Sequence, residues 1–347
     1  MQEKGGELET GPYDVVEKWP QPMAPAGFTW GSQGGVFAET PNKIFIAQRG
    51  ILPLSEKGEP EYGVAGKPAT GGKSKLEHTI VVVDANGKLL QDWTQHDHLF
   101  AKGRGPHKIK ISPYDPEKHV WVVDDNSHQV FKFSNDGSKI VQTWGEWKVS
   151  GNDQTHFARP TDIAWLPDGT FFVSDGYANT RVVKFDKAGK FLMTWGTPGT
   201  GQGQFNLPHS IDIDNRRRVY VADRSNARIQ IFDENGKYLD MWNNIRSPYH
   251  IMVTADQHLW VADGITMKYL KYDLNGKLLY SWGTYGSFPG AFWGVHQFHV
   301  DSDGNLYGAE TFGGRTQKYR PRRGVDPSQL IGAPMTKIPA TMSSASR

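Results

Sequence analysis

The sequence of 347 residues predicts an all-β fold, a six-bladed β-propeller. Three observations support this prediction. Four short apolar stretches recur as a unit along the chain, Gly-containing dipeptides separate them, and the last unit lacks one stretch that the N-terminus supplies. A repeat of roughly 40 to 50 residues built from four strands is typical of propeller blades.

The repeat is clearest in the unit that begins at His107. Its four stretches alternate apolar and polar residues, as half-buried strands do, and cover residues 107–111, 120–124, 129–133 and 140–144. The same series begins again at Thr161, His209 and Tyr249. Asp-Gly and Asn-Gly pairs predict hairpin turns between strands, because these residues tolerate a positive φ. The pairs are Asp136-Gly137, Asp168-Gly169, Asn235-Gly236, Asn275-Gly276 and Asp303-Gly304.

Two further units complete the array. One begins at Val36 and carries a Gly-, Pro- and Lys-rich insertion at about 50–77, and the other begins at His296 and ends without an outer strand. Residues 13–19 resemble the outer strand at 277–282, so we expect them to complete the last blade and to close the ring. The predicted propeller covers residues 1–324, followed by a C-terminal tail at 325–347. An open solenoid or two sandwiches is the alternative architecture.

The composition limits the partners and the compartment. A net charge of +2 argues against a nucleic-acid-binding protein, since such proteins carry a basic surface that neutralises phosphates. No apolar run approaches the roughly 20 residues that span a bilayer. The chain has no cysteine, hence no disulfide and no thiolate metal site. We expect a secreted or periplasmic monomer from which a signal peptide has been removed.

Three histidines occupy one repeat position. The residue after the turn that opens each unit is His107, Thr161, His209, Tyr249 or His296. The first strand of each blade lines the channel of a propeller, and alternate blades of six are separated by about 120°. Three imidazoles would therefore converge on one point, as in a zinc site with three protein ligands and an open position. The alternative is that these histidines bond to water or to the backbone.

A second set of polar residues follows the Val-x-Asp motif at the end of the next strand. It consists of Arg49, Asp125, Tyr177 and Arg224, which we expect at the same channel mouth. A phenol can transfer a proton, and guanidinium groups bind an anionic substrate. Beside a metal that acts as a Lewis acid, these groups would form an active site. Taken singly, each of them could equally cap a strand or a loop.

The sequence resembles the catalytic core of the peptidyl-α-hydroxyglycine α-amidating lyases over about residues 34–319. The most specific segments are 153–157, 160–162, 173–179, 203–205, 208–210, 222–224 and 228–230. The resemblance implies an NHL-type six-bladed propeller with zinc on His107, His209 and His296. It also implies that Tyr177 is the catalytic tyrosine and that Arg49 and Arg224 are the active-site arginines. That family splits a hydroxylated glycine C-terminus into a peptide amide and glyoxylate.

Several positions depart from the family pattern. The resemblance places a calcium ion near the backbones of Val36 and Ile109, but Gln297 stands where the family has an acidic ligand. A neutral amide is a poor ligand for a hard cation, so we expect calcium to bind weakly or not at all. Gly294 replaces a methionine that faces the substrate. The family's disulfide positions hold Ala158 with Ala178, and Tyr220 with Ile231.

These features favour a zinc-dependent carbon–nitrogen lyase that acts on a small hydroxylated, anionic substrate or on a peptide C-terminus. Other divalent transition metals also suit three imidazoles. One alternative is another metal-dependent lyase or hydrolase on the same fold, because a fold does not fix a function. Another is a non-enzymatic NHL-type propeller that binds a protein or a glycan. Metal content separates these hypotheses, since a pure scaffold has no need of three histidines in register.

Overall fold

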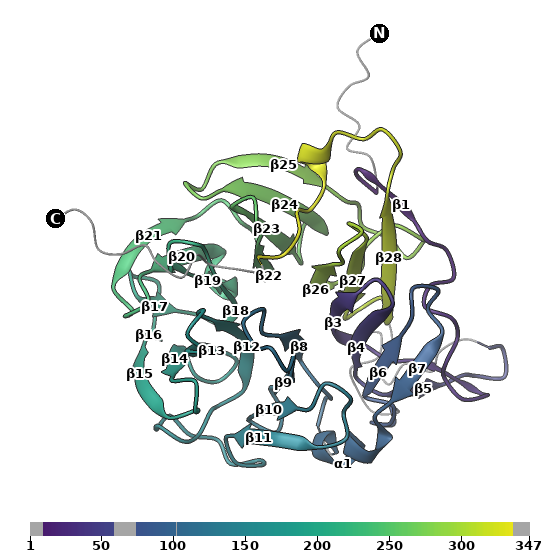
Figure 1. Ribbon diagram of the computed structural model, residues 1–347, viewed down its shortest axis with the longest axis horizontal. Coiled ribbons are helices and arrows are strands. Elements are labelled where there is room, and N and C mark those ends of the chain that lie inside the picture. The colour runs from purple at the N-terminus through teal and green to yellow at the C-terminus, as the bar shows by residue number, and fades with distance from the viewer. Residues whose placement is uncertain (1–9, 59–73, 102, 336–347) are drawn as a thin grey trace, which may run out of the picture. The chain divides into compact units, whose positions relative to one another are not determined.

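A computed structural model describes residues 10–58, 74–101 and 103–335 (Figure 1). These residues form six four-stranded sheets, the arrangement of a six-bladed β-propeller, and two small two-stranded sheets. The all-β prediction is confirmed. Helices in the described part of the chain are single turns, namely η1 (Thr94–His96), α1 (Asp97–Phe100), η2 (Arg224–Asn226) and η3 (Pro327–Gln329). None of them is long enough to cross a membrane.

The chain divides into two compact units, residues 1–109 with 260–333 and residues 110–259 with 334–347. In the first unit, one sheet joins β3 (Gln33–Thr40), β4 (Lys43–Gln48), β6 (Ile80–Val83) and β7 (Leu89–Asp92). A second sheet joins β1 (Tyr13–Val15), β28 (Arg315–Pro321), β27 (Leu306–Glu310) and β26 (Val295–Val300). Strands β2 (Phe28–Trp30) and β5 (Ile51–Pro53) form a small sheet.

In the second unit, two complete sheets follow each other along the chain. One joins β12 (Pro160–Trp165), β13 (Phe171–Asp175), β14 (Arg181–Phe185) and β15 (Phe191–Trp195), which lie side by side in Figure 1. The other joins β18 (Pro208–Ile213), β19 (Val219–Asp223), β20 (Arg228–Phe232) and β21 (Tyr238–Trp242). Between them lies the short parallel pair β16 (Thr197–Pro198) and β17 (Gln204–Phe205).

Two further four-stranded sheets complete the set. One runs β11 (Ile140–Trp144), β10 (Gln129–Phe133), β9 (Val120–Asp124) and β8 (Lys108–Ile111). The other runs β22 (Pro248–Val253), β23 (His258–Asp263), β24 (Lys268–Asp273) and β25 (Leu278–Trp282). All six four-stranded units predicted from the repeat are therefore present.

The N-terminal strand pairs with the last blade, as predicted. Figure 1 shows β1 beside β28. Within this pair, Tyr13 lies opposite Pro321 and Val15 lies opposite Tyr319. The strand is shorter than the predicted segment 13–19, because Lys18 has a φ of 58°, which is incompatible with an extended strand. Beyond it, Trp19 leaves the sheet edge and packs on Tyr307, with ring centroids 5.1 Å apart.

Each unit has its own apolar core between neighbouring sheets. In the second unit, Trp121 stacks on Trp144 at 4.8 Å, and both pack around buried Phe171. In the first unit, the core includes Val36, Ile46, Val81, Tyr307 and Ala309. Inner and middle strands are mostly buried, and β13 is buried throughout, whereas outer strands such as β15 alternate between half-buried and exposed residues. Aromatic and β-branched residues dominate these strands because they fill the space between packed sheets.

The predicted turns are present. Gly169, for example, has a φ of 87° and donates its N–H to Leu166 O at 3.0 Å. Part of the insertion at about 50–77 and the end of the predicted tail lie outside the described residues. Within the described part of the tail, Ile331 is buried and its N–H donates to the Tyr13 hydroxyl at 2.9 Å.

Candidate functional site

The predicted histidines stand at irregular points of the inner strands. In β18 the register with β19 shifts between Pro208 and Ser210, and in β26 the register with β27 shifts between Val295 and Gln297. His209 and His296 are therefore the extra residues of two β-bulges. Bulges redirect a side chain out of the regular alternation of a strand. His107 precedes the first residue of β8.

The first unit holds two of these histidines in contact. His107 and His296 are both buried, and their rings meet edge to face with centroids 4.6 Å apart. Nδ1 of His296 lies 2.7 Å from Gly34 O. Because a carbonyl only accepts, Nδ1 carries the proton in this bond, and Nε2 is the nitrogen of a neutral ring that could bind a metal.

Arg49 of the first unit is a buried cation. It is 7% exposed, and its Nε donates to the carbonyl of Pro106, the residue before His107, at 3.4 Å. Within the described ranges, no carboxylate pairs with Arg49. A buried guanidinium without a counter-charge is costly unless an anion compensates it. This arrangement is suited to a negatively charged ligand.

The second unit holds His209 with Tyr177 and Arg224. His209 is buried, and its Nδ1 lies 2.7 Å from Tyr249 O, which assigns the proton to Nδ1 as in His296. The Tyr177 hydroxyl lies 3.0 Å from Nε2 of the same ring, and Nη1 of Arg224 lies 3.4 Å from the Tyr177 oxygen. The guanidinium of Arg224 also lies 4.5 Å from the ring centroid of Tyr249.

Carboxylates of the Val-x-Asp motif position the loops that carry these groups. Asp175 accepts hydrogen bonds from Ala158 N at 2.9 Å and from Arg181 Nε at 2.9 Å, just before Tyr177. Asp223 accepts from Asn206 N and Arg228 Nε, both at 2.7 Å, just before Arg224. Burial raises the pKa of Asp175, although Asn179 and Arg181 oppose this shift. These carboxylates are structural anchors, and an aspartate recurs at this position in four of the six repeats, as Asp124, Asp175, Asp223 and Asp263.

Asp125, the fourth residue of the predicted second set, is linked to Tyr177 through Arg159. It is buried and accepts a hydrogen bond from Nε of Arg159 at 3.1 Å. The Arg159 guanidinium lies 4.5 Å from the centroid of the Tyr177 ring. Sequence analysis missed Arg159, although it precedes Pro160 and Thr161 in the turn that opens the blade. Its place in that turn is the sequence feature that could have identified Arg159 as a candidate site residue.

The structure thus places the predicted residues as follows. In the first unit, His107 meets His296, and Arg49 lies against the residue before His107. In the second unit, His209, Tyr177 and Arg224 form one cluster. Each of the three buried histidines offers a ring nitrogen that could hold a metal ion.

The residues of the predicted calcium site are close together in the first unit. Gln297 donates from Nε2 to Ile109 O at 2.8 Å, and its Oε1 accepts from Ile109 N at 3.3 Å. Val36, in β3, is buried. The buried ammonium of Lys108 lies beside them and donates to His296 O at 2.9 Å. The carbonyl of Ile109, a predicted calcium ligand, therefore already accepts an N–H, and the positively charged Lys108 lies beside it.

A buried polar network lies on the inner strands of the second unit. Nζ of Lys110 lies 2.8 Å from Asp162 Oδ1, and the Ser210 hydroxyl donates to Asp162 Oδ2 at 2.5 Å. Nδ1 of His250 lies 3.1 Å from the same hydroxyl. Burial raises the pKa of Asp212 to about 6, the charge of Lys110 lowers it, and the charge of Asp162 adds to the rise.

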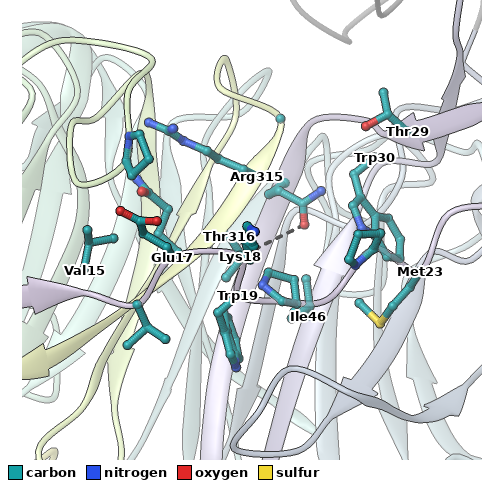
Figure 2. A pocket seen from close by; sticks show the side chains of 17 residues that line it. Val15, Glu17, Lys18, Trp19, Met23, Thr29, Trp30, Ile46, Arg315 and Thr316 are labelled. Carbon is teal, nitrogen blue, oxygen red and sulfur yellow. Dashed lines mark hydrogen bonds between the residues drawn. The ribbon is translucent and has the colours of Figure 1, made fainter. Parts of the chain in front are cut away.

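A separate cavity of about 330 Å³ opens in the first unit. Figure 2 shows Trp30 and Met23 on one side of it and Val15 and Glu17 on the other, with a hydrogen bond of 3.3 Å from Thr316 to Gln33 between them. None of the predicted site residues lines this cavity.

Comparison with known proteins supports the resemblance. Residues 205–232 match the NHL repeat model. The chain is 40% identical over 171 residues to a peptidyl-glycine α-amidating monooxygenase of Mus musculus, which covers 46% of the chain and 16% of that protein. It is 42% identical over 157 residues to a probable peptidyl-α-hydroxyglycine α-amidating lyase of Caenorhabditis elegans, 44% of the chain and 43% of that protein. The chain thus spans less than half the length of these two relatives.

Other similarities concern proteins with different names. The chain is 36% identical over 189 residues to NHL repeat-containing protein 3 of Homo sapiens, 51% of the chain and 52% of that protein. A streptogramin B lyase structure superposes with a TM-score of 0.54 at 12% identity, covering 89% of this chain and 98% of that one. At this identity the likeness shows the fold alone. The chain therefore carries an NHL repeat on a six-bladed β-propeller and is homologous to the peptidyl-α-hydroxyglycine α-amidating lyases.

Proposed function

We propose that the protein is a zinc-dependent carbon–nitrogen lyase in which His107, His209 and His296 bind one metal ion. The substrate is a small, hydroxylated, anionic molecule of the α-hydroxyglycine type, from which glyoxylate is released. The proposed compartment is extracellular or periplasmic, in keeping with the expectation from the sequence. The homology to named amidating lyases supports the reaction class.

The hydrogen bonds of two histidines to backbone carbonyls are the observation that carries the proposal. His209 and His296 each donate Nδ1–H to a backbone carbonyl at 2.7 Å, to Tyr249 and to Gly34 respectively. Such bonds fix the tautomer and the ring orientation of metal-ligating histidines. Bonds of this kind leave Nε2 as the unprotonated nitrogen of both neutral rings, the form that a metal ligand requires.

The bound ion would supply a Lewis acid that polarises the substrate hydroxyl and lowers its pKa. Tyr177 lies at hydrogen-bond distance from the ligating nitrogen of His209, so its oxygen can exchange a proton with a group bound there. In the proposed reaction, Tyr177 acts as a phenolate and removes the proton of the hydroxyl. The carbon–nitrogen bond breaks as the carbonyl of glyoxylate forms, and the departing nitrogen takes the proton from the Tyr177 phenol.

Two arginines would hold the substrate carboxylate. Arg49 is buried without an acidic partner, and among the described residues Arg224 also has none. An unneutralised guanidinium presents its fork of N–H groups to a carboxylate. Both groups therefore favour an anionic substrate.

The space around Gly294 bears on the rest of the substrate. Gly294 has a φ of 77°, and a side chain added there would lie 2.4 Å from Cδ2 of the Phe312 ring. A methionine at this position would require Phe312 to move. In the proposed enzyme, the half-buried Phe312 makes the apolar contact with the substrate that the family's methionine makes. A peptide substrate would therefore meet a differently shaped surface at this point.

The test combines metal analysis with a product assay. The purified protein should contain about one zinc per chain by elemental analysis and should release glyoxylate from an α-hydroxyglycine substrate. Removal of zinc with a chelator should abolish release, and added zinc should restore it. Zinc without glyoxylate would reject this substrate, and a protein without a transition metal would reject the metal site as well.

A further inference from the structure

In the second unit, two arginine side chains alternate with two tyrosine rings, in the order Arg159, Tyr177, Arg224 and Tyr249. The Arg159 guanidinium lies 4.5 Å from the Tyr177 ring centroid, and the Arg224 guanidinium lies 5.4 Å from the same centroid. Arg224 also lies 4.5 Å from the Tyr249 ring. Tyr177 thus contacts two guanidinium groups at once. Stacking of this kind stabilises one orientation of a ring.

The two arginines differ in their counter-charge. Arg159 is paired with buried Asp125 through Nε at 3.1 Å and through Nη2. Arg224 has no acidic partner within the described residues. Asp125 neutralises Arg159 and fixes its planar fork, so Arg159 is poorly suited to bind a substrate anion. The guanidinium of Arg159 also contacts the Tyr177 ring.

The backbone at this position does not require an arginine. Arg159 has a φ of 66°, and its carbonyl accepts from Tyr177 N at 3.1 Å. In the next blade, Leu207 has a φ of 72°, and its carbonyl accepts from Arg224 N at 3.1 Å. The same turn therefore forms with leucine. The side chain of Arg159 serves a purpose that the turn itself does not explain.

We infer that Asp125 and Arg159 form a positioning pair that holds the ring of Tyr177 in the orientation needed for proton transfer. This inference rests on the proposed function of Tyr177. In this proposal the pair acts on the reaction through Tyr177 and does not itself bind the substrate.

The chain offers a matched control in the same unit. Arg218 pairs with Asp214, with Nε 2.7 Å from Oδ2, and its guanidinium lies 5.6 Å from the Tyr220 ring. Arg218 and Arg159 are exposed to similar extents, 25% and 27% of the side chain. The double variants D125N/R159Q and D214N/R218Q each replace an ion pair by two neutral amides, which avoids leaving a buried aspartate charge unpaired.

The first measurement needs no activity. In protein labelled with ¹³C at the tyrosine ring, the Tyr177 signal is assigned by its loss in Tyr177→Phe. D125N/R159Q should shift or broaden the Tyr177 signal and leave Tyr220 unchanged, whereas D214N/R218Q should do the reverse. An unchanged Tyr177 signal in a folded D125N/R159Q variant would overturn the inference.

The second measurement is a double-mutant cycle of glyoxylate release. D125N/R159Q should lower kcat by about 10- to 100-fold, the effect of misplacing a reacting group, with little change in KM. Added to Tyr177→Phe, the same change should cause no further loss, because it acts only through that ring. Losses that multiply would show that the pair acts independently. If the wild type releases no glyoxylate, the proposed reaction fails, and the ring signals alone decide the inference.

Discussion

The Tyr177 hydroxyl donates to Nε2 of His209 at 3.0 Å, while Nδ1 of the same ring donates to the Tyr249 carbonyl. Both nitrogens of this imidazole are therefore engaged, one as donor and one as acceptor. A metal ion bound to His209 would use the lone pair that now accepts the phenol proton. Tyr177 and a metal thus compete for one atom, which ties the proposed proton-transfer group to the proposed ligand.

Replacing Tyr177 by Phe should separate proton transfer by Tyr177 from metal binding by His209. Loss of the hydroxyl removes the competing donor, so zinc should bind at least as tightly as in the wild type. Turnover should fall by about two to four orders of magnitude, the usual contribution of a general acid–base group. Zinc titration and glyoxylate release measure the two effects. A variant with wild-type turnover would show that Tyr177 is structural.

Replacing His209 by Ala should release the metal and leave the fold intact, because two histidines hold zinc far more weakly than three. His299 provides the control. It also lies on an inner strand, but its Nδ1 accepts from Ala38 N at 3.2 Å and its ring stacks on Phe37 at 3.9 Å. His299→Ala should keep full zinc content by elemental analysis. Full zinc in His209→Ala would reject the three-histidine assignment.

The sequence predicted the blades because their strands repeat a pattern of burial. Val120–Asp124 and Phe171–Asp175 both begin with three apolar residues and end in Asp, and both are fully buried. The N-terminal partner of the last blade was found in the same way. The length of this strand was predicted wrongly. β1 ends before Lys18, which has a positive φ, and no pattern in the sequence indicates that conformation.

Replacing Arg49 by Met should raise stability and weaken substrate binding. A buried cation without a carboxylate costs desolvation, so removing it should raise the free energy of unfolding by about 1 kcal/mol or more. Loss of a charge-assisted hydrogen bond to the substrate should raise KM about 10- to 100-fold. Urea unfolding and kinetics measure these effects.

Arg228 is the matched comparison for Arg49. It is equally buried at 4% exposure, but it is paired with Asp223 at 2.7 Å. Arg228→Met should destabilise the protein by about 3 to 5 kcal/mol, because it leaves a buried carboxylate unpaired. If Arg49→Met destabilises to the same extent, Arg49 has a structural partner and is not a free anion site.

Calcium should not be retained after dialysis against a chelator. The Gln297 amide donates to Ile109 O at 2.8 Å, and the ammonium of Lys108 lies nearby on His296 O. Calcium binds several oxygens, most favourably carboxylates, and is repelled by a resident cation. Elemental analysis of one sample for zinc and calcium measures both. Stoichiometric calcium that survives the chelator would show that backbone carbonyls suffice.

The candidate site was predictable only in part. His107, His209 and His296 could be predicted as one set because they occupy the same position of the repeat. Arg159 was missed because its contact with Tyr177 depends on Asp125, which lies 34 residues earlier in another blade. A pair of this kind leaves no periodic pattern, since the neighbouring blades have Gly105 and Leu207 at the equivalent turn.

The polar network of the second unit predicts a pH dependence of stability. Burial raises the pKa of Asp212 to about 6, with a further rise from the charge of Asp162, and Lys110 opposes the shift. An unfolded aspartate has a pKa of about 3.9, so the folded protein binds this proton more tightly than the unfolded chain. The stability that the proton contributes is complete below about pH 4 and is lost as the pH rises through about 6.

Asp212→Asn keeps the hydrogen bond from Ile213 N or Val253 N to a side-chain oxygen but cannot titrate. Between about pH 4 and 6, the free energy of unfolding should therefore fall less steeply in this variant than in the wild type. Asp303→Asn, on an exposed hairpin turn, should retain the wild-type slope. Urea unfolding at a series of pH values measures the three slopes. Equal slopes for wild type and Asp212→Asn would show that Asp212 is already ionised in the folded protein, with Lys110 neutralising both carboxylates.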